Sequence, residues 1–224
     1  MDIKSNITNL FKIIEEIGSD KQYGNEKVSQ LEHAIQCALL AKKNNENNFF
    51  ITAALFHDIG HLINNDKEAI KKGVDKKHEN SGSFFLSKFF PEDVTRLIKG
   101  HVPAKRYLVY YEKGYYEALS IASKRSLDVQ GGSFSEEEAN EFIKQPFMQD
   151  AVRLRKYDDL AKVENLEIPN INFFLFRKIA VTFPNIANIK NININKSYPP
   201  TFHIKEPIHG PAILPIIYCK AKIP

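Results

Sequence analysis

The sequence predicts an all-α fold, a helical bundle over residues 1–170 followed by an extended arm over residues 171–224. Two observations favour the bundle. Apolar residues before residue 170 recur at intervals of three and four, and no stretch there alternates as a strand would. The arm is rich in proline, isoleucine and asparagine and holds seven of the eleven prolines. Because proline at this density excludes long helices, we expect extended chain or short strands there.

The first helices are predicted from their apolar spacing. Residues 25–44 place Val28, Leu31 and Ile35 at helical intervals. Residues 47–63 follow as a second helix that is apolar almost all round, so it is expected at the centre of the bundle.

Prolines and capping residues delimit the later helices. A third helix over residues 77–90 ends before Pro91, which starts a fourth that stops before Pro103. Ser135, with Glu138 three residues later, is typical of a capping box and begins a helix within residues 133–145. The glycine-marked stretch 127–135 is expected to be a loop, and residues 147–163 form the last helix of the bundle.

Charge and composition exclude several classes of protein. The net charge is +4, but residues 171–224 alone carry +6, so the bundle is mildly acidic and nucleic acid is not an expected partner. No apolar run is long enough to span a membrane, and residues 1–20 lack a secretory signal, so we expect a cytoplasmic protein. Cys37 and Cys219 are too few for a disulfide framework or a thiolate metal site.

Histidines are concentrated where a core would prefer leucine. Five of the seven lie between residues 33 and 101, each within or at the edge of a predicted helix, and Asp58 follows one of them directly. Taken singly, each is more readily explained as a hydrogen-bonded core residue. Taken together, several helices would each bury an unexplained polar group, and a shared metal ion would satisfy all of them.

The adjacent pair His57-Asp58 resembles the signature of the HD-domain superfamily. The likeness runs from Tyr23 to Phe174 and includes "VSQLEH", "AALFHDIGHL", "HVPAKRYL", "LDVQGG" and "RLRKYDD". In this combination the chain is most similar to the mixed-valent diiron oxygenases of the superfamily that act on 2-amino-1-hydroxyethylphosphonate. In "RLRKYDD", Tyr157 stands where the motif of these oxygenases has tryptophan.

The resemblance implies a role for each of twelve residues. The metal ligands would be His33, His57, Asp58, His78, His101 and Asp158, with Asp58 bridging two metals. Tyr23 and Glu26 would form a lid, in which Glu26 receives the amino group of the substrate. The phosphonate would be held by Lys105, Ser123 and Arg155, and His61 would lie beside the substrate. A dianionic phosphonate suits a lysine charge and an arginine fork.

The activity implied is oxidative cleavage of the carbon–phosphorus bond of this small organophosphonate, which gives glycine and phosphate. The enzyme would be a monomer or a homodimer. Its cofactors would be two iron ions, Fe(II) and Fe(III), with dioxygen as co-substrate. The ligand types alone suit iron, manganese or zinc equally.

Three alternatives stay open. The same chemistry on the N-trimethylated substrate would give glycine betaine. An HD-type phosphohydrolase would use its metal ions to activate water at a phosphate ester. A binding module would hold ligands without turnover. A quaternary ammonium group is usually held by aromatic rings, and only Tyr23 is evident, which favours the primary amine.

Overall fold

The computed structural model describes residues 7–63, 77–168 and 182. Regular structure within these residues is helical, and their one β pairing is an isolated bridge between Gln22 and Ser29, which confirms the all-α prediction. The helices are α1 (Ile7–Lys12), the π-helix η1 (Ile13–Ile17), α2 (Gln30–Lys43), α3 (Asn48–Phe56), α4 (Ile59–Ile63), α6 (His78–Leu86), α7 (Glu92–Tyr111), α8 (Tyr115–Ala118), α9 (Ile121–Val129), α10 (Glu136–Lys144) and α11 (Met148–Leu160). The predicted arm lies outside the described residues, apart from Thr182.

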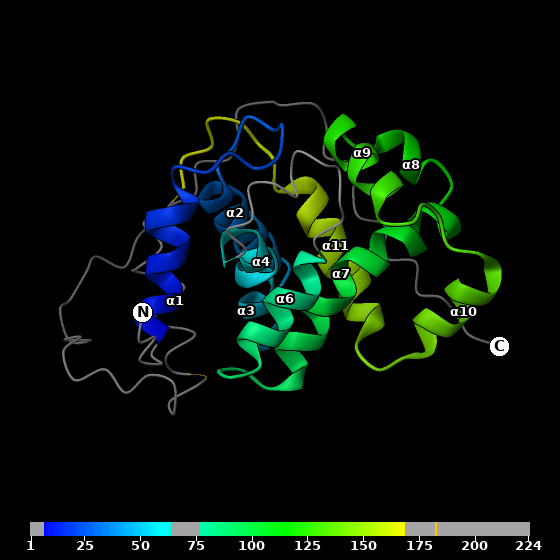
Figure 1. The fold of residues 1–224 in the computed structure, drawn as a ribbon, viewed down its shortest axis with the longest axis horizontal. Coiled ribbons are helices and arrows are strands. Elements are labelled where there is room, and N and C mark those ends of the chain that lie inside the picture. Colours follow the sequence, from blue (N-terminus) through cyan, green and yellow to red (C-terminus); the bar gives the residue numbers. More distant parts are fainter. Residues whose placement is uncertain (1–6, 64–76, 169–181, 183–224) are drawn as a thin grey trace. The chain divides into compact units, whose positions relative to one another are not determined.

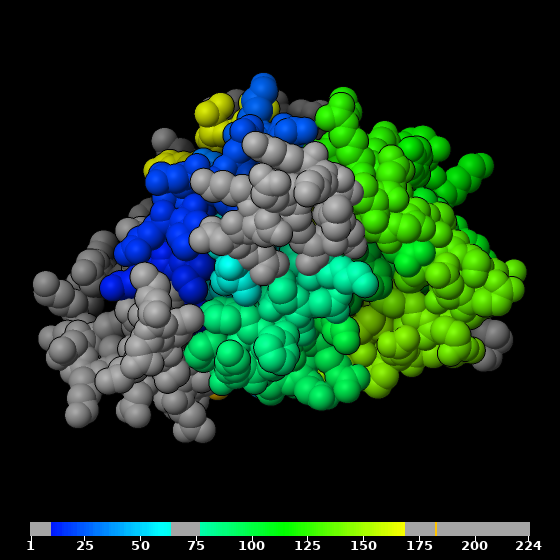
Figure 2. All heavy atoms as spheres, in the orientation of Figure 1, coloured from blue at the N-terminus to red at the C-terminus, as the bar shows by residue number. Residues whose placement is uncertain are grey.

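The long helix α7 organises the bundle. It packs against α11, α6 and α3, while α2 packs against α3 and α11 (Figure 1). From Phe50 to Phe56 every residue of α3 is buried, as its apolar sequence predicts. Residues of α6 and of the segment from α8 to α10 form much of the outer face drawn in Figure 2. No helix in the described ranges combines the length and apolarity needed to cross a membrane.

Side-chain caps fix where several helices begin. Ser29 and Glu32 form a reciprocal capping box at the start of α2, and Asn47 caps α3. The capping box predicted for Ser135 and Glu138 is present at α10. Because each cap satisfies main-chain donors that a helix end leaves unpaired, these short polar residues define the helix starts.

The predicted helix over residues 47–63 is wrong in one respect. The chain forms two helices there, because α3 ends at Phe56 and α4 begins only at Ile59. His57 and Asp58 lie in the turn between them. Gly60 then lets α4 contact the start of α6, since a Cβ atom at Gly60 would lie 2.0 Å from the carbonyl oxygen of His78.

The predicted end of the fourth helix before Pro103 is also wrong. Helix α7 continues through Pro103 to Tyr111. Proline removes one hydrogen bond from a helix interior. The residues beyond it, including Ala104, Lys105 and Leu108, are buried against the helices that follow, and this packing offsets the loss. Local rules underestimate such tertiary stabilisation.

Candidate metal centre

Six polar side chains from separate segments converge in the interior of the bundle. They are His33 of α2, His57 and Asp58 of the turn after α3, His78 of α6, His101 of α7 and Asp158 of α11. None is more than 7% exposed. These are the six residues that the sequence resemblance singles out as metal ligands, and the fold brings all of them together.

Four of these residues form a first group of donors. The Nε2 atoms of His33 and His57 lie 3.2 Å apart, and Oδ2 of Asp58 lies 3.8 and 3.5 Å from them. Asp158 approaches the same two rings, with Oδ1 3.4 Å from His33 Nε2 and Oδ2 3.9 Å from His57 Nε2. Two imidazoles and two carboxylates are a donor set that suits a transition-metal ion.

The second group contains His78, His101 and Asp58. The Nε2 atoms of the two histidines lie 3.0 Å apart, and Oδ1 of Asp58 is 3.2 Å from His78 Nε2 and 3.4 Å from His101 Nε2. Asp58 therefore directs one carboxylate oxygen towards each group. This is the arrangement expected of a carboxylate that bridges two metal ions.

Main-chain carbonyls hold three of the histidines in the orientation that metal binding requires. The Nδ1 atoms of His33, His57 and His101 lie 2.8, 2.9 and 2.6 Å from the carbonyl oxygens of Ala161, Ala54 and Ile98. When Nδ1 donates to a carbonyl, the neutral ring keeps its free lone pair on Nε2. Lone pairs that face one another across about 3 Å repel unless a proton or a cation lies between them. The residues therefore fit a pair of bound metal ions.

The ionisation states of His57, Asp58 and Asp158 also suit metal binding. Burial lowers the pKa of His57 to about 4, so the ring is neutral at pH 7. Burial acts to raise the pKa of Asp58 and of Asp158. Interactions with His57 and hydrogen bonds from His101 and His78 outweigh it at Asp58, so the pKa of Asp58 is well below its usual value. The charge of Arg155 and a hydrogen bond from His33 do the same for the pKa of Asp158. Neutral imidazoles and ionised carboxylates are the forms that coordinate a metal.

A cavity of about 400 Å³ opens onto this centre. Asp58, His78, His101 and Asp158 line it, together with all of the residues predicted to contact substrate: Tyr23, Glu26, His61, Lys105, Ser123 and Arg155. The volume is within the range of small-molecule sites. The predicted substrate residues and metal ligands therefore share one site.

Tyr23 and Glu26 lie in the segment between η1 and α2. The ring of Tyr23 stacks on His33 with 3.7 Å between centroids, and its hydroxyl donates to Oδ1 of Asp158 at 3.0 Å. Burial raises the pKa of Tyr23 well above 10, so the phenol keeps its proton. Oε1 of Glu26 is buried without a hydrogen-bond partner in the described chain. Tyr23 therefore covers the first group, and Glu26 lines the cavity beside it.

Lys105 and Arg155 bring positive charge into the cavity. Lys105 is 2% exposed and donates to Oγ of Ser126 at 2.7 Å. Arg155 is 4% exposed and donates from Nη1 to Oδ2 of Asp158 at 2.6 Å. Burial lowers the pKa of Lys105 to about 7. The pKa of Arg155 is raised, because the charges of Asp158 and Asp159 outweigh its burial.

His61 lies beside the second group. Its ring stacks on His78 with 3.9 Å between centroids, and burial lowers its pKa to about 3. The ring is therefore neutral at pH 7, and it lines the cavity as predicted.

Four contacts in the site were not foreseen from the sequence. Lys162 donates to Oγ of Ser123 at 3.0 Å, and its Nζ lies 3.8 Å from Oε1 of Glu26. Asp159 accepts hydrogen bonds from Arg155 and from the hydroxyl of Tyr115. In the predicted helix over residues 147–163, Lys162 follows Asp158 by four residues, a spacing at which helical side chains share a face. Helix α11 ends at Leu160, so this spacing does not explain the position of Lys162.

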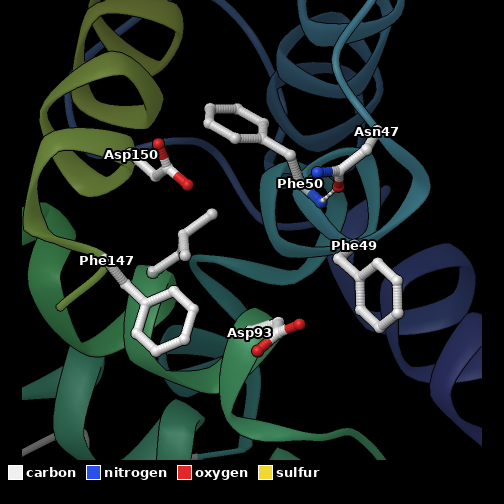
Figure 3. A pocket seen from close by; sticks show the side chains of 7 residues that line it. Asn47, Phe49, Phe50, Asp93, Phe147 and Asp150 are labelled. Carbon is white, nitrogen blue, oxygen red and sulfur yellow. Dashed lines mark hydrogen bonds between the residues drawn. The ribbon is translucent and has the colours of Figure 1, made fainter.

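A second hollow is smaller and unrelated to the histidines. It measures about 70 Å³ and is surrounded by Asn47, Phe49, Phe50, Asp93, Leu97, Phe147 and Asp150 (Figure 3). Asp150 already pairs with Arg153, whose Nη1 lies 2.7 Å from Oδ1. The chemistry of the described residues is therefore concentrated in the larger cavity.

Comparison with known proteins gives three findings. The sequence profile of the HD domain matches residues 30–129. The hydroxymethylphosphonate dioxygenase of Gimesia maris is 42% identical over 167 residues, which cover 74% of this chain and 82% of the relative. The glycine-betaine-forming [1-hydroxy-2-(trimethylamino)ethyl]phosphonate dioxygenase of Leisingera caerulea is 36% identical over 165 residues, which cover 70% of this chain and 84% of the relative.

Proposed function

Since this chain belongs to the HD-domain family, in the branch of these phosphonate dioxygenases, we propose that it is an oxygen-dependent enzyme that cleaves carbon–phosphorus bonds. Its substrate would be a small 1-hydroxyphosphonate. The observation that carries the proposal is the shared cavity, in which two groups of metal-binding side chains lie next to buried cationic side chains.

We assign the metal pair to iron. His33, His57 and Asp158 would hold one ion, His78 and His101 the other, and Asp58 both. Iron in the Fe(II)/Fe(III) state would supply the redox chemistry that activates dioxygen, which separates this reaction from metal-assisted hydrolysis.

The buried cations would hold the phosphonate. Lys105 and Arg155 carry positive charge on the cavity wall, and Ser123 offers a hydroxyl. Because Lys162 donates to Ser123 Oγ, the proton of that hydroxyl is free to point towards an anion in the cavity. Such charge-assisted hydrogen bonds are stronger in a buried site than in water.

The remaining end of the cavity supports 2-amino-1-hydroxyethylphosphonate as the substrate. Oε1 of Glu26 is a buried acceptor that lacks a donor, and a primary ammonium group would supply one. Among the described lining residues Tyr23 is the only aromatic ring apart from histidines, so there is no cage for a trimethylammonium group. One molecule of this substrate and one of dioxygen contain all the atoms and electrons of glycine and phosphate, so the reaction needs no external reductant.

Hydroxymethylphosphonate is a second candidate. Lys162 lies 3.8 Å from Glu26 and can balance its charge without any cation on the substrate. The 42% identical relative is named for this compound. Hydroxymethylphosphonate would be cleaved to formate and phosphate, again with one dioxygen and no external reductant.

A substrate panel tests these assignments. Oxygen uptake and phosphate release would be measured with the aminoethyl, trimethylaminoethyl and hydroxymethyl compounds on one iron-loaded preparation. We expect one phosphate per dioxygen consumed, with the highest kcat/KM for the primary amine. A higher value for either other compound would replace the substrate assignment. Turnover of phosphate esters without oxygen would instead favour an HD-type phosphohydrolase.

A further inference from the structure

Glu79 distinguishes the second metal-binding group from the first. Three of the four histidines in the centre hold Nδ1 against a main-chain carbonyl, at 2.6 to 2.9 Å. His78 is different, because its Nδ1 faces the carboxylate of Glu79, with Oε2 at 3.7 Å. Among the described residues, it is the one ligand histidine whose Nδ1 faces a charged side chain.

The position of His78 in its helix explains the difference. His57 and His101 reach carbonyls three residues earlier, those of Ala54 and Ile98, because helical chain precedes them. His78 is the first residue of α6, and Lys77 before it has a left-handed backbone with φ of 46°. Within the described residues, the acceptor that faces His78 Nδ1 is the carboxylate of Glu79.

Glu79 is well suited to this task. It is 5% exposed, and its Oε1 accepts from Asn80 at 2.6 Å. Its Oε2 is buried and has no hydrogen-bond partner within the described ranges. A buried acceptor without a donor is destabilising, and a small rotation of the Glu79 side chain towards His78 Nδ1–H would give it one. Its place in the first turn of α6 also favours a negative charge.

We propose that Glu79 is a positioning residue for the metal ion held by His78 and His101. By accepting the Nδ1 proton, its carboxylate fixes the tautomer of His78 with Nε2 free and makes that nitrogen a stronger donor. The inference rests on the metal pair of the proposed function but not on the identity of the phosphonate.

Manganese titration separates the two ions. Mn²⁺ binding to metal-stripped protein would be followed by the EPR signal of the free ion, for the native chain and for Glu79→Gln and Glu79→Ala. The group with Asp158 has one more carboxylate, so we assign the tighter site to it. We expect the weaker affinity to fall by about ten- to a hundredfold in both variants, while the tighter one is unchanged.

Glutamine fills nearly the same volume as glutamate, so a role in packing alone would leave Glu79→Gln normal. Glu46→Gln is a matched control, because Glu46 is a largely buried carboxylate that pairs with Arg153 and not with a ligand histidine. Unchanged weaker affinity in Glu79→Gln, or an equal loss in Glu46→Gln, would overturn the proposal while leaving the metal pair intact. Binding of a single Mn²⁺ by the native chain would overturn both.

Discussion

At the scale of single residues, Asp58 is the side chain on which the two donor groups depend. In the part of the chain that the structure describes, it is the one residue that contributes an oxygen to each of them. Two metal ions brought close together repel strongly in a medium of low dielectric, and a shared anion offsets this repulsion. His33, His57, His78 and His101 contribute no negative charge and cannot take its place.

The variant Asp58→Ala should therefore lose both metal ions. We expect less than one ion per chain after gel filtration, as measured by plasma emission spectroscopy, against two for the native protein. Asp158→Ala should keep the ion held by His78 and His101, because that group does not include Asp158. The exposed Asp128→Ala serves as control. Retention of two ions in Asp58→Ala would refute the bridging role.

Lys105 should make anion binding depend on pH. Burial lowers its pKa to about 7, so the charged form is present below that pH and is lost above it. Sulfate, a tetrahedral dianion whose charge is constant near neutral pH, should bind metal-stripped protein most tightly below pH 7. Calorimetry across this range should show affinity that declines on the alkaline side.

Two variants isolate the contribution of Lys105. Lys105→Met should bind sulfate weakly at every pH, because the buried cation is gone. Lys113→Met, at an exposed position, should behave like the native chain. The explanation fails if Lys105→Met keeps the same decline above pH 7.

At the scale of the elements, close contacts between helices position the ligands. Gly60 brings α4 against the first residue of α6, where His78 lies. Gly100, next to His101, brings α7 against α11, since a Cβ atom there would lie 2.7 Å from Cβ of Ala151. The glycines therefore set the spacing between segments that carry the ligands.

Gly60→Ala should displace His78 and weaken the ion bound with His101. The added Cβ would lie 2.0 Å from a main-chain oxygen, which cannot rotate away. Gly82→Ala meets the main chain at 3.2 Å and should have a smaller effect. Measuring the manganese affinity of both variants tests which effect is larger. A Gly60→Ala protein with native affinity at both sites would contradict the role of Gly60.

Much of the bundle could be predicted from the sequence, because helical spacing and capping residues act locally. The capping box at Ser135 is one such case. The break at His57-Asp58 and the continuation of α7 through Pro103 could not, since both are decided by packing between distant segments. Lys162 was missed for the same reason, because its partners Glu26 and Ser123 are far from it in the sequence.

The ligand set itself was predicted by resemblance and not by spacing. The first and last of its residues, His33 and Asp158, lie 125 positions apart, and nothing in the local sequence relates them. The fold places Asp158 3.4 Å from His33. This agreement concerns position, and the roles of the twelve site residues remain predictions.

At the scale of the whole molecule, bound metal ions would join α2, the turn after α3, α6, α7 and α11. A ligand that binds only the folded state stabilises it by about 2.7 kcal/mol at a hundred times its Kd. For a domain of this size, each kcal/mol raises Tm by about 2 to 4 °C. Each ion should thus add about 5 to 10 °C.

Calorimetry of chelator-treated and metal-loaded protein measures this difference. Re-addition of metal should restore the native Tm, and Asp58→Ala should not respond to metal at all. Identical Tm values with and without metal would show that the ions do not link these segments.

The most direct test of the metal centre is the anomalous scattering of a crystal of the iron-loaded protein, recorded at the iron edge. Two peaks about 3.5 to 4 Å apart are expected. One should lie among His33, His57 and Asp158 and the other between His78 and His101, with Asp58 between the two. A single peak, or none within reach of these side chains, would contradict the dinuclear centre and the oxygenase chemistry that depends on it.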